Sequence, residues 1–146
     1  MIGSAFLLSL SACQVGPGIV CDYVPSSLFF IKRVTGSNEL IPEVSLSNFT
    51  FEGTASVPEA LFEADEIYNY AGSNATIDGG TVSCAPVCEF GFDAAEGAYA
   101  FDLSAPGYST KRITVGAEYQ PVRSPAQCAP DRAPVKLELS LGPSAS

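Results

Sequence analysis

The chain has 146 residues, of which sixteen are acidic and seven basic, so its formal net charge at pH 7 is −9. This negative charge repels nucleic-acid phosphates and anionic lipid headgroups, and we therefore exclude a nucleic-acid partner. The absence of histidine excludes Ser–His and Cys–His nucleophiles and every metal site built on histidine. We therefore expect a protein that is not an enzyme, with no catalytic residue, no cofactor and no metal.

The first residues form an apolar run that is too short to cross a bilayer. Ile2 to Ala12 falls below the roughly 20 residues that a membrane-spanning helix needs, and is typical of a signal-peptide core. Leu10-Ser11-Ala12-Cys13 resembles the lipobox of bacterial lipoproteins, although no Lys or Arg precedes it. An apolar N-terminal strand with a buried thiol is the alternative.

The lipobox resemblance has three implications. Residues 1–12 would be a signal peptide, and Cys13 would carry the lipid anchor, with fatty acyl chains such as palmitate. Gln14, which follows the cysteine, would direct the protein to the bacterial outer membrane or cell surface. The membrane would then be a partner through the lipid alone.

The cysteine count agrees with an oxidising compartment. Of five cysteines, removal of Cys13 leaves an even set, which consists of Cys21, Cys84, Cys88 and Cys128. We expect two structural disulfides, and the sequence alone does not choose among the three possible pairings. No C-x-x-C motif is present, so we expect neither a zinc ribbon nor a thioredoxin-like redox site.

The remaining length fits one domain, which we place at residues 26–141, after a tether at 13–25 and before a disordered tail at 142–146. Ser27 to Val34 is a β-rich run that ends at the turn TGSN. Glu43 to Phe51 alternates apolar and polar residues. The two runs are predicted to be paired strands.

One helix is predicted from Val57 to Tyr68. Ser56 stands where an N-cap is expected, Pro58 falls in the first turn, and Glu59 follows three residues after the cap. Apolar residues then recur at helical spacing. The alternative interpretation is an extended acidic excursion along a sheet edge.

The loop after this segment contains the candidate ligand-binding residues. Tyr68 and Tyr70 could stack on a sugar ring beside Asn74, although aromatic residues next to a loop more often cover core edges. The sequons at Asn48 and Asn74 have no use in a bacterial host and are interpreted as accidental.

The acidic residues between Arg33 and Lys111 are interpreted as a solvated face. Twelve acids and no bases lie in that stretch, without the D-x-[DN]-x-[DN]-G pattern of a calcium loop. A glycosidase that used Glu63, Asp65 or Glu66 would need two acids held in a cleft. These three crowd one short segment, so we do not expect catalysis from them.

Strand signals become dense after Gly80. Short apolar runs alternate with turns, and Pro106-Gly107 has the chemistry of a type II turn that would join a hairpin. A Pro-rich stretch from Ala117 to Pro134 precedes a closing strand from Val135 to Leu141. The predicted fold is mainly β, an antiparallel β-sandwich of about seven strands with one short helical insert.

The segment CEFGFDAAEGAYAFDLSAPGYSTKRITV, together with Cys128 and VKLELSL, resembles the carboxypeptidase regulatory-like domain. The motifs are Gly97-Ala98-Tyr99 and then Gly107-Tyr108, and the match is best from Cys88 to Leu141. The resemblance implies a transthyretin-like (prealbumin-like) sandwich of the kind found in bacterial surface lipoproteins, and brings no catalytic residue with it. We expect disulfides between Cys88 and Cys128 and between Cys21 and Cys84, with a Cys84–Cys88 bridge as the alternative.

The sequence therefore predicts a non-catalytic cell-envelope lipoprotein that acts as a structural or protein-interaction module. An extracellular glycan- or peptide-binding module is the alternative, and a soluble secreted inhibitor is a third. The expected partners are the membrane, through the anchor, and an envelope protein or glycan.

Overall fold

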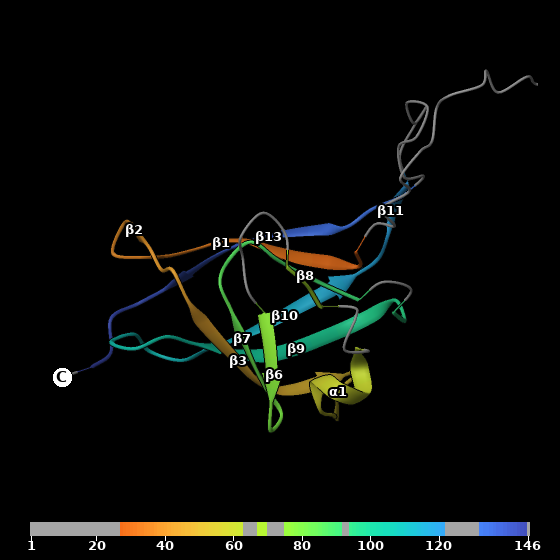
Figure 1. The fold of residues 1–146 in the computed structure, drawn as a ribbon, viewed down its shortest axis with the longest axis horizontal. Helices are drawn as coiled ribbons and strands as arrows, with labels where there is room; N and C mark the ends of the chain where they lie inside the picture. The colour runs from red at the N-terminus through yellow and green to blue at the C-terminus, as the bar shows by residue number, and fades with distance from the viewer. Residues whose placement is uncertain (1–26, 63–66, 70–74, 92–93, 122–131, 146) are drawn as a thin grey trace, which may run out of the picture.

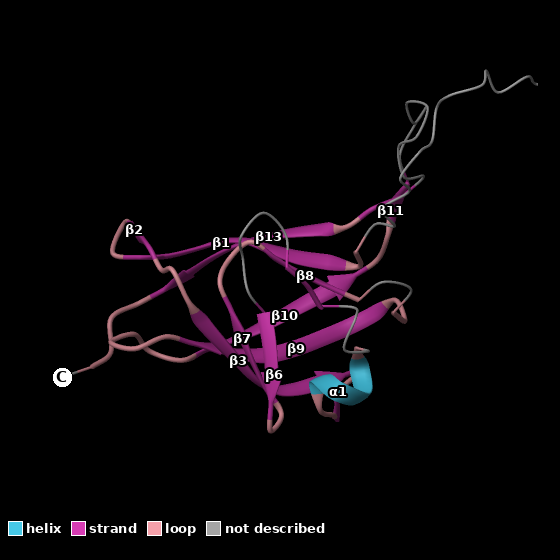
Figure 2. Ribbon diagram, in the orientation of Figure 1, coloured by secondary structure: helices cyan, strands magenta, loops and turns pink. Residues whose placement is uncertain are grey.

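The structure is a computed structural model that describes residues 27–62, 67–69, 75–91, 94–121 and 132–145 (Figure 1). Strands dominate these residues and form two facing sheets, with one short helix beside them (Figure 2). The predicted mainly β sandwich is therefore confirmed. Cys13, Cys21 and Cys128 lie outside the described residues, as do the expected signal peptide and tether.

Each sheet combines strands from both halves of the chain. The first sheet has the order β13 (Val135–Leu141), β1 (Phe29–Gly36), β8 (Cys88–Phe90) and β5 (Ile67–Asn69), and β2 (Glu39–Leu40) also pairs with β1. The second has the order β10 (Lys111–Ala117), β9 (Gly97–Ser104), β3 (Val44–Phe51), β7 (Thr81–Cys84) and β6 (Ala75–Asp78), and β4 (Thr54–Ala55) pairs with β3. A separate ribbon joins β11 (Gln120–Pro121) to β12 (Arg132–Ala133).

The first and last long strands lie side by side and run in parallel. Phe29 pairs with Val135 at one end of the ladder, and Gly36 pairs with Leu141 at the other. Every other described strand pair is antiparallel. The closing strand was predicted correctly, and its pairing with β1 is the one parallel pair among the described strands of this mostly antiparallel sandwich.

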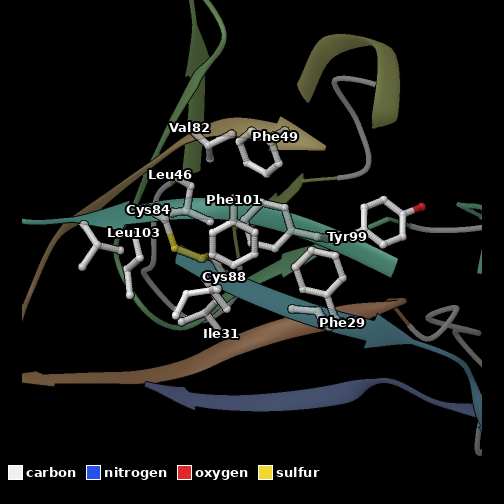
Figure 3. Close-up of a cluster of buried hydrophobic side chains, with 14 of the residues drawn as sticks. Phe29, Ile31, Leu46, Phe49, Val82, Cys84, Cys88, Tyr99, Phe101 and Leu103 are labelled. Atoms are coloured by element: carbon white, nitrogen blue, oxygen red, sulfur yellow. A yellow bond between two sulfur atoms is a disulfide. The ribbon is translucent and has the colours of Figure 1, made fainter. Parts of the chain in front are cut away.

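A cluster of aromatic rings fills the space between the sheets (Figure 3). Phe29 from the first sheet is fully buried, and its ring centroid lies 5.1 Å from that of Phe90 and 5.7 Å from that of Tyr99. Phe49 and Phe101 extend the cluster from the second sheet at a centroid distance of 5.6 Å. Buried aromatic pairs at these separations add to the hydrophobic stabilisation of a core.

The two sheets are joined covalently by a disulfide between Cys84 and Cys88. Cys84 ends β7 in the second sheet and Cys88 begins β8 in the first, and both are fully buried (Figure 3). The expected Cys21–Cys84 and Cys88–Cys128 disulfides are therefore wrong, and the alternative, a Cys84–Cys88 bridge, is confirmed. The physical reason is that the chain crosses between sheets within four residues, which places the two Cα atoms 6.2 Å apart.

The predicted pairing of the two N-terminal strands is also wrong, because β1 and β3 lie in different sheets. Ser37 and Asn38 both have positive φ, 48° and 71°, as a two-residue type I′ turn requires. After this turn the chain pairs with β1 only over the two residues of β2. Pro42, which has no N–H to continue the ladder, follows, and the chain crosses to the second sheet.

The predicted helix from Val57 to Tyr68 is reduced to one turn, α1 (Pro58–Leu61), whose N-cap is Val57 rather than Ser56. Pro58 does occupy the first turn as expected. Phe62 ends the helix in an extended conformation and is 1% exposed, 5.6 Å from the Phe90 ring. Burial of this ring outweighs the weak tendency of a short segment to continue as a helix. Residues 67–69 form the edge strand β5, in line with the alternative interpretation.

A β-bulge at Asn48 changes the phase of β3. Ser47 pairs with Asp102 and Thr50 with Ala100, so β3 holds one extra residue, and Asn48 has a φ of 51°. The extra residue lets both Leu46 and Phe49 point into the core. Outside the core, the Asn48 side-chain amide donates to Asp102 at 2.7 Å.

Arg112 on β10 completes this polar network. Its guanidinium donates to the backbone carbonyl of Asn48, to Asp102 at 3.1 Å and to Thr50 at 3.2 Å. The arginine therefore satisfies the carbonyl that the bulge leaves without a ladder partner.

The hairpin of β9 and β10 has the predicted turn, in which Gly107 has a φ of 82°. The five C-terminal residues were expected to be disordered, but residues 142–144 are bonded to this turn. Ser109 N–H donates to the Gly142 carbonyl at 2.9 Å, and Ser144 N–H donates to the Gly107 carbonyl at 3.1 Å. The composition of the C-terminal residues could not predict these bonds, because their partners belong to the turn between β9 and β10.

We predict that Cys84→Ala with Cys88→Ala lowers the free energy of unfolding by about 2 kcal/mol, the loop-closure value for so short a loop. Urea unfolding of the oxidised protein measures this loss. Mass mapping of unreduced peptides should place Cys84 and Cys88 in one linkage. A linked peptide that joined Cys88 to Cys128 would contradict the structure.

We also predict a pH-dependent cost for Asp102→Asn. Hydrogen bonds from Asn48 and then from Arg112 lower the pKa of Asp102 below its ordinary value of 3.8. The carboxylate therefore stabilises the fold above that value, and this contribution is lost as pH falls through the lower folded pKa. Urea unfolding at pH 7 should show a loss of about 0.2–1 kcal/mol that shrinks below pH ~4. Asp78→Asn, on the exposed end of β6, is the matched control and should leave the free energy of unfolding at pH 7 unchanged.

Candidate functional site

The candidate site is an apolar ridge, which we define as residues Leu40 to Pro42, at the β1–β2 end of the sandwich (Figure 1). Its centre is fixed, because Ile41 is 7% exposed and its N–H donates to the Val34 carbonyl at 2.9 Å. The neighbouring Leu40 is 66% exposed. The ridge therefore presents a large apolar side chain to solvent on a fixed backbone.

A basic groove of about 550 Å³ runs along one side of the ridge. Lys32, Arg33, Glu138 and Pro86 line it together with the ridge residues. It lies where β1 has no strand beside it, between the residues that pair with β8 and those that pair with β2. Lys32 forms an exposed ion pair with Glu138 at 3.5 Å, which leaves Arg33 without an ion pair among the described residues.

An acidic groove of about 390 Å³ runs along the other side of the ridge. Glu39 and Glu43 line it, with Pro106 and Tyr108 from the turn between β9 and β10. The two grooves share the ridge as a common wall. A bound segment would therefore meet apolar surface at the centre and charges of opposite sign on the two sides.

Gly36 holds the two hairpins of this end together. A Cβ on Gly36 would overlap the ring of Tyr108, so the glycine allows the ring to lie directly on β1. Tyr108 also bridges to Pro143. Tyr108 thus contacts β1 through its ring and the C-terminal residues through its backbone, and it holds both beside the acidic groove.

The two grooves beside the ridge have a mixed apolar and charged lining. The residues that line the two grooves include prolines, aliphatic side chains, one tyrosine and charged groups, and no cysteine, serine or threonine that could act as a nucleophile. Over the described ranges of the chain, no group of three Cys, Asp or Glu side chains is placed to hold a metal ion. Apolar contact with flanking charges is typical of protein and peptide partners.

Two carboxyl groups with shifted pKa values lie away from the ridge. Burial raises the pKa of Glu89 above 4.5, and the neighbouring Ser27 hydroxyl lowers it by a smaller amount. Glu89 pairs with Phe30, near the start of β1, whereas the ridge follows its end. Asp102, whose pKa is lowered, belongs to the bulge network. Neither carboxyl lines either groove.

The predicted site residues cannot be placed in one pocket. Tyr70, Asn74 and Cys13 lie outside the described residues, and so do residues 63–66 with the three acids considered above. Tyr68 falls in β5, paired with Glu89, and only its backbone is described.

The ridge was not predicted from the sequence. Its signal is the apolar triplet of NELIPE, which stands between two glutamates and directly after a type I′ turn. A short apolar run outside the alternating strands, closed by a proline, could have marked it.

We predict that Gly36→Ala lowers the free energy of unfolding by about 1–3 kcal/mol, because the added methyl group displaces the Tyr108 ring. The same change in a Tyr108→Ala background should cost much less, since the ring is gone. Urea unfolding of the four proteins in this double-mutant cycle measures the coupling. An equal cost in both backgrounds would show that the ring does not occupy this position.

Compared with protein-family models, curated proteins and solved structures, the chain matches none. The two motifs that resemble the carboxypeptidase regulatory-like domain nevertheless have structural roles here. Tyr99 of the first motif is 1% exposed in the aromatic cluster, and Gly107 of the second allows the turn beside the ridge. The fold is therefore assigned from the structure itself as a two-sheet β-sandwich, and no family is assigned.

Proposed function

We propose that this chain is a non-catalytic, lipid-anchored cell-envelope protein that binds a protein partner through the ridge Leu40 to Pro42. The observation that carries the proposal is the 66% exposed Leu40 on a fixed backbone between two grooves of opposite charge. Large apolar side chains rimmed by polar residues mark interaction sites on protein surfaces.

The anchor part of the proposal is supported by the lipobox resemblance at Cys13 and by the cysteine count. With Cys84 and Cys88 bonded to each other, the other two are Cys21 and Cys128, an even pair once Cys13 carries lipid. In the described part of the chain, no helix has the length and apolar character needed to span a membrane. Two or more acyl chains hold a protein durably at a bilayer.

The position of the ridge suits a protein that is anchored from its N-terminal side. The described chain enters the sandwich at Ser27, next to the start of β1. β1 then extends for eight residues, about 26 Å at the usual strand rise, before the turn that leads to the ridge. The ridge therefore lies at the opposite end of β1 from the point where the described chain enters the sandwich.

The grooves define the chemistry of the partner. The aliphatic side chain of Leu40 needs an apolar or aromatic side chain to cover it. On one side Arg33 favours an acidic group, and on the other Glu39 and Glu43 favour a basic one. An extended protein segment with an apolar residue between an acidic and a basic residue fits this arrangement. No described feature favours a glycan, because the residues proposed for sugar stacking lie outside the described side chains.

The proposal predicts that lipid labelling and partner crosslinks can be abolished in cells by two different substitutions. Wild-type protein should incorporate a palmitate analogue, and Cys13→Ser should not. A photo-crosslinker at Glu39 should give discrete crosslinked envelope proteins, and Leu40→Asp should abolish them because a charge replaces the apolar contact.

Val57→Asp is the matched control, since Val57 is the other large apolar side chain that is strongly exposed in the described residues, at 50%. It should leave the crosslinks unchanged. Equal palmitate labelling of wild type and Cys13→Ser would refute the anchor. Identical crosslinks in wild type and Leu40→Asp would refute the ridge.

A further inference from the structure

The last strand, β13, leaves one long edge of the first sheet open. It pairs with β1 on one side, and within the described residues no strand pairs with its other side. It has seven residues, contains no proline, and has no bulge of its own, since the extra residue of the β1–β13 ladder lies on β1 between Ile31 and Arg33. Prolines and bulges are two of the features that protect natural edge strands against pairing; charged side chains are another, and β13 does carry Lys136 and Glu138.

The backbone groups on the open edge can be assigned by residue. Val135 N–H donates to the Leu28 carbonyl at 3.1 Å, which points Val135 towards β1. Because successive residues of a strand point their backbone groups to alternate sides, Lys136, Glu138 and Ser140 point outward. The Ser140 carbonyl agrees with this assignment, since it accepts a hydrogen bond from Lys111 Nζ of the other sheet at 3.3 Å.

We propose that two copies of this chain pair through β13, antiparallel about a two-fold axis at Leu137. Lys136 of each copy then lies opposite Glu138 of the other. Both residues point their backbone groups outward, so each such pair exchanges two N–H···O=C hydrogen bonds, and Leu137 meets its own symmetry mate in the closely spaced position between them. The result is one continuous sheet across the dimer.

The side-chain charges select this register over its neighbours. An axis one residue earlier would place Lys136 opposite Lys136, and an axis one residue later would place Glu138 opposite Glu138. Like charges directly opposite each other destabilise a strand pair, whereas opposite charges stabilise it. Both side chains are on the exposed face of β13, where Glu138 also contacts Lys32 and Lys136 lies 5.7 Å from the centroid of the Phe30 ring.

The ends of the paired segment fit the same register. Ser140 would lie opposite Pro134, and its N–H can donate to the Pro134 carbonyl. Pro134 has no N–H to return to the Ser140 carbonyl, and Lys111 already supplies that donor within the copy. Every outward backbone group from Lys136 to Ser140 therefore has a partner in the dimer.

The inner face of β13 gains from the same pairing. Val135, Leu137 and Leu139 are only partly buried in the single copy, although they pack against the core. In the dimer Val135 lies opposite Leu139, and burial of the remaining apolar area favours association. A net charge of −9 on each copy opposes it, and salt screens that repulsion. We therefore expect a reversible dimer whose association is stronger at physiological than at low salt.

The test is sedimentation of the full chain over a concentration series that reaches about 1 mM. Wild type should show a monomer–dimer equilibrium. Lys136→Glu and Glu138→Lys should each weaken dimerisation by about tenfold or more, because each places two like-charge pairs in the interface. An equimolar mixture of the two variants should regain the wild-type association to within about threefold, since both pairs are then opposite in charge.

The controls separate this interface from folding and from the ridge. Glu39→Lys makes the same change of charge as Glu138→Lys on β2, and should dimerise like wild type. Recovery in the mixture requires both variants to be folded, so it cannot arise from misfolding. Amide exchange at Lys136 and Glu138 should slow as wild type dimerises.

Three outcomes would each overturn the proposal: a wild type that stays monomeric throughout, a mixture no more dimeric than its components, or a dimer whose Lys136 and Glu138 amides exchange as in the monomer. If a different protein is the natural partner of this edge, the wild type would stay monomeric. None of them bears on the ridge, whose crosslinks are tested separately.

Discussion

The packing of Phe29 against rings from both sheets is the interaction on which the rest of this structure depends. Its ring lies between Phe90 of its own sheet and Tyr99 of the opposite sheet, and Phe62 reaches it from the segment after the helix at 6.1 Å. In a chain without tryptophan, these rings supply much of the large buried apolar surface. They fix the position of β1, which is the strand that organises both surfaces discussed above.

β1 carries a different partner along each part of its length. Its first residues pair with β8 and its last residues with β2, and its other side pairs with β13 except at Lys32. The gap between β8 and β2 becomes the basic groove, and the turn after Gly36 lifts Leu40 into solvent. The strand that the Phe29 contact holds in the core thus leads directly to the exposed Leu40 eleven positions later.

Local patterns predicted local features well, and long-range pairing poorly. The alternation in Val135 to Leu141 and the Pro106-Gly107 pair identified a strand and a turn, because both depend on neighbours in the sequence. The helix was overestimated because the pattern that favoured it left out Phe62, whose burial depends on rings from four other segments. The pairing of β1 with β3 and of Cys84 with Cys21 failed because sequence does not show in which sheet a strand will lie. The ridge was missed for the same reason: Leu40 is exposed only because Ile41 is held by Val34.

The parallel arrangement of β1 and β13 has a mechanical consequence. The described chain enters beside Phe29 and leaves after Leu141, at opposite ends of the ladder that the two strands share. A pull between these points would load the interstrand hydrogen bonds in shear, all at once, rather than peel them apart in succession. A domain loaded in this way resists tension along the direction of its first and last strands.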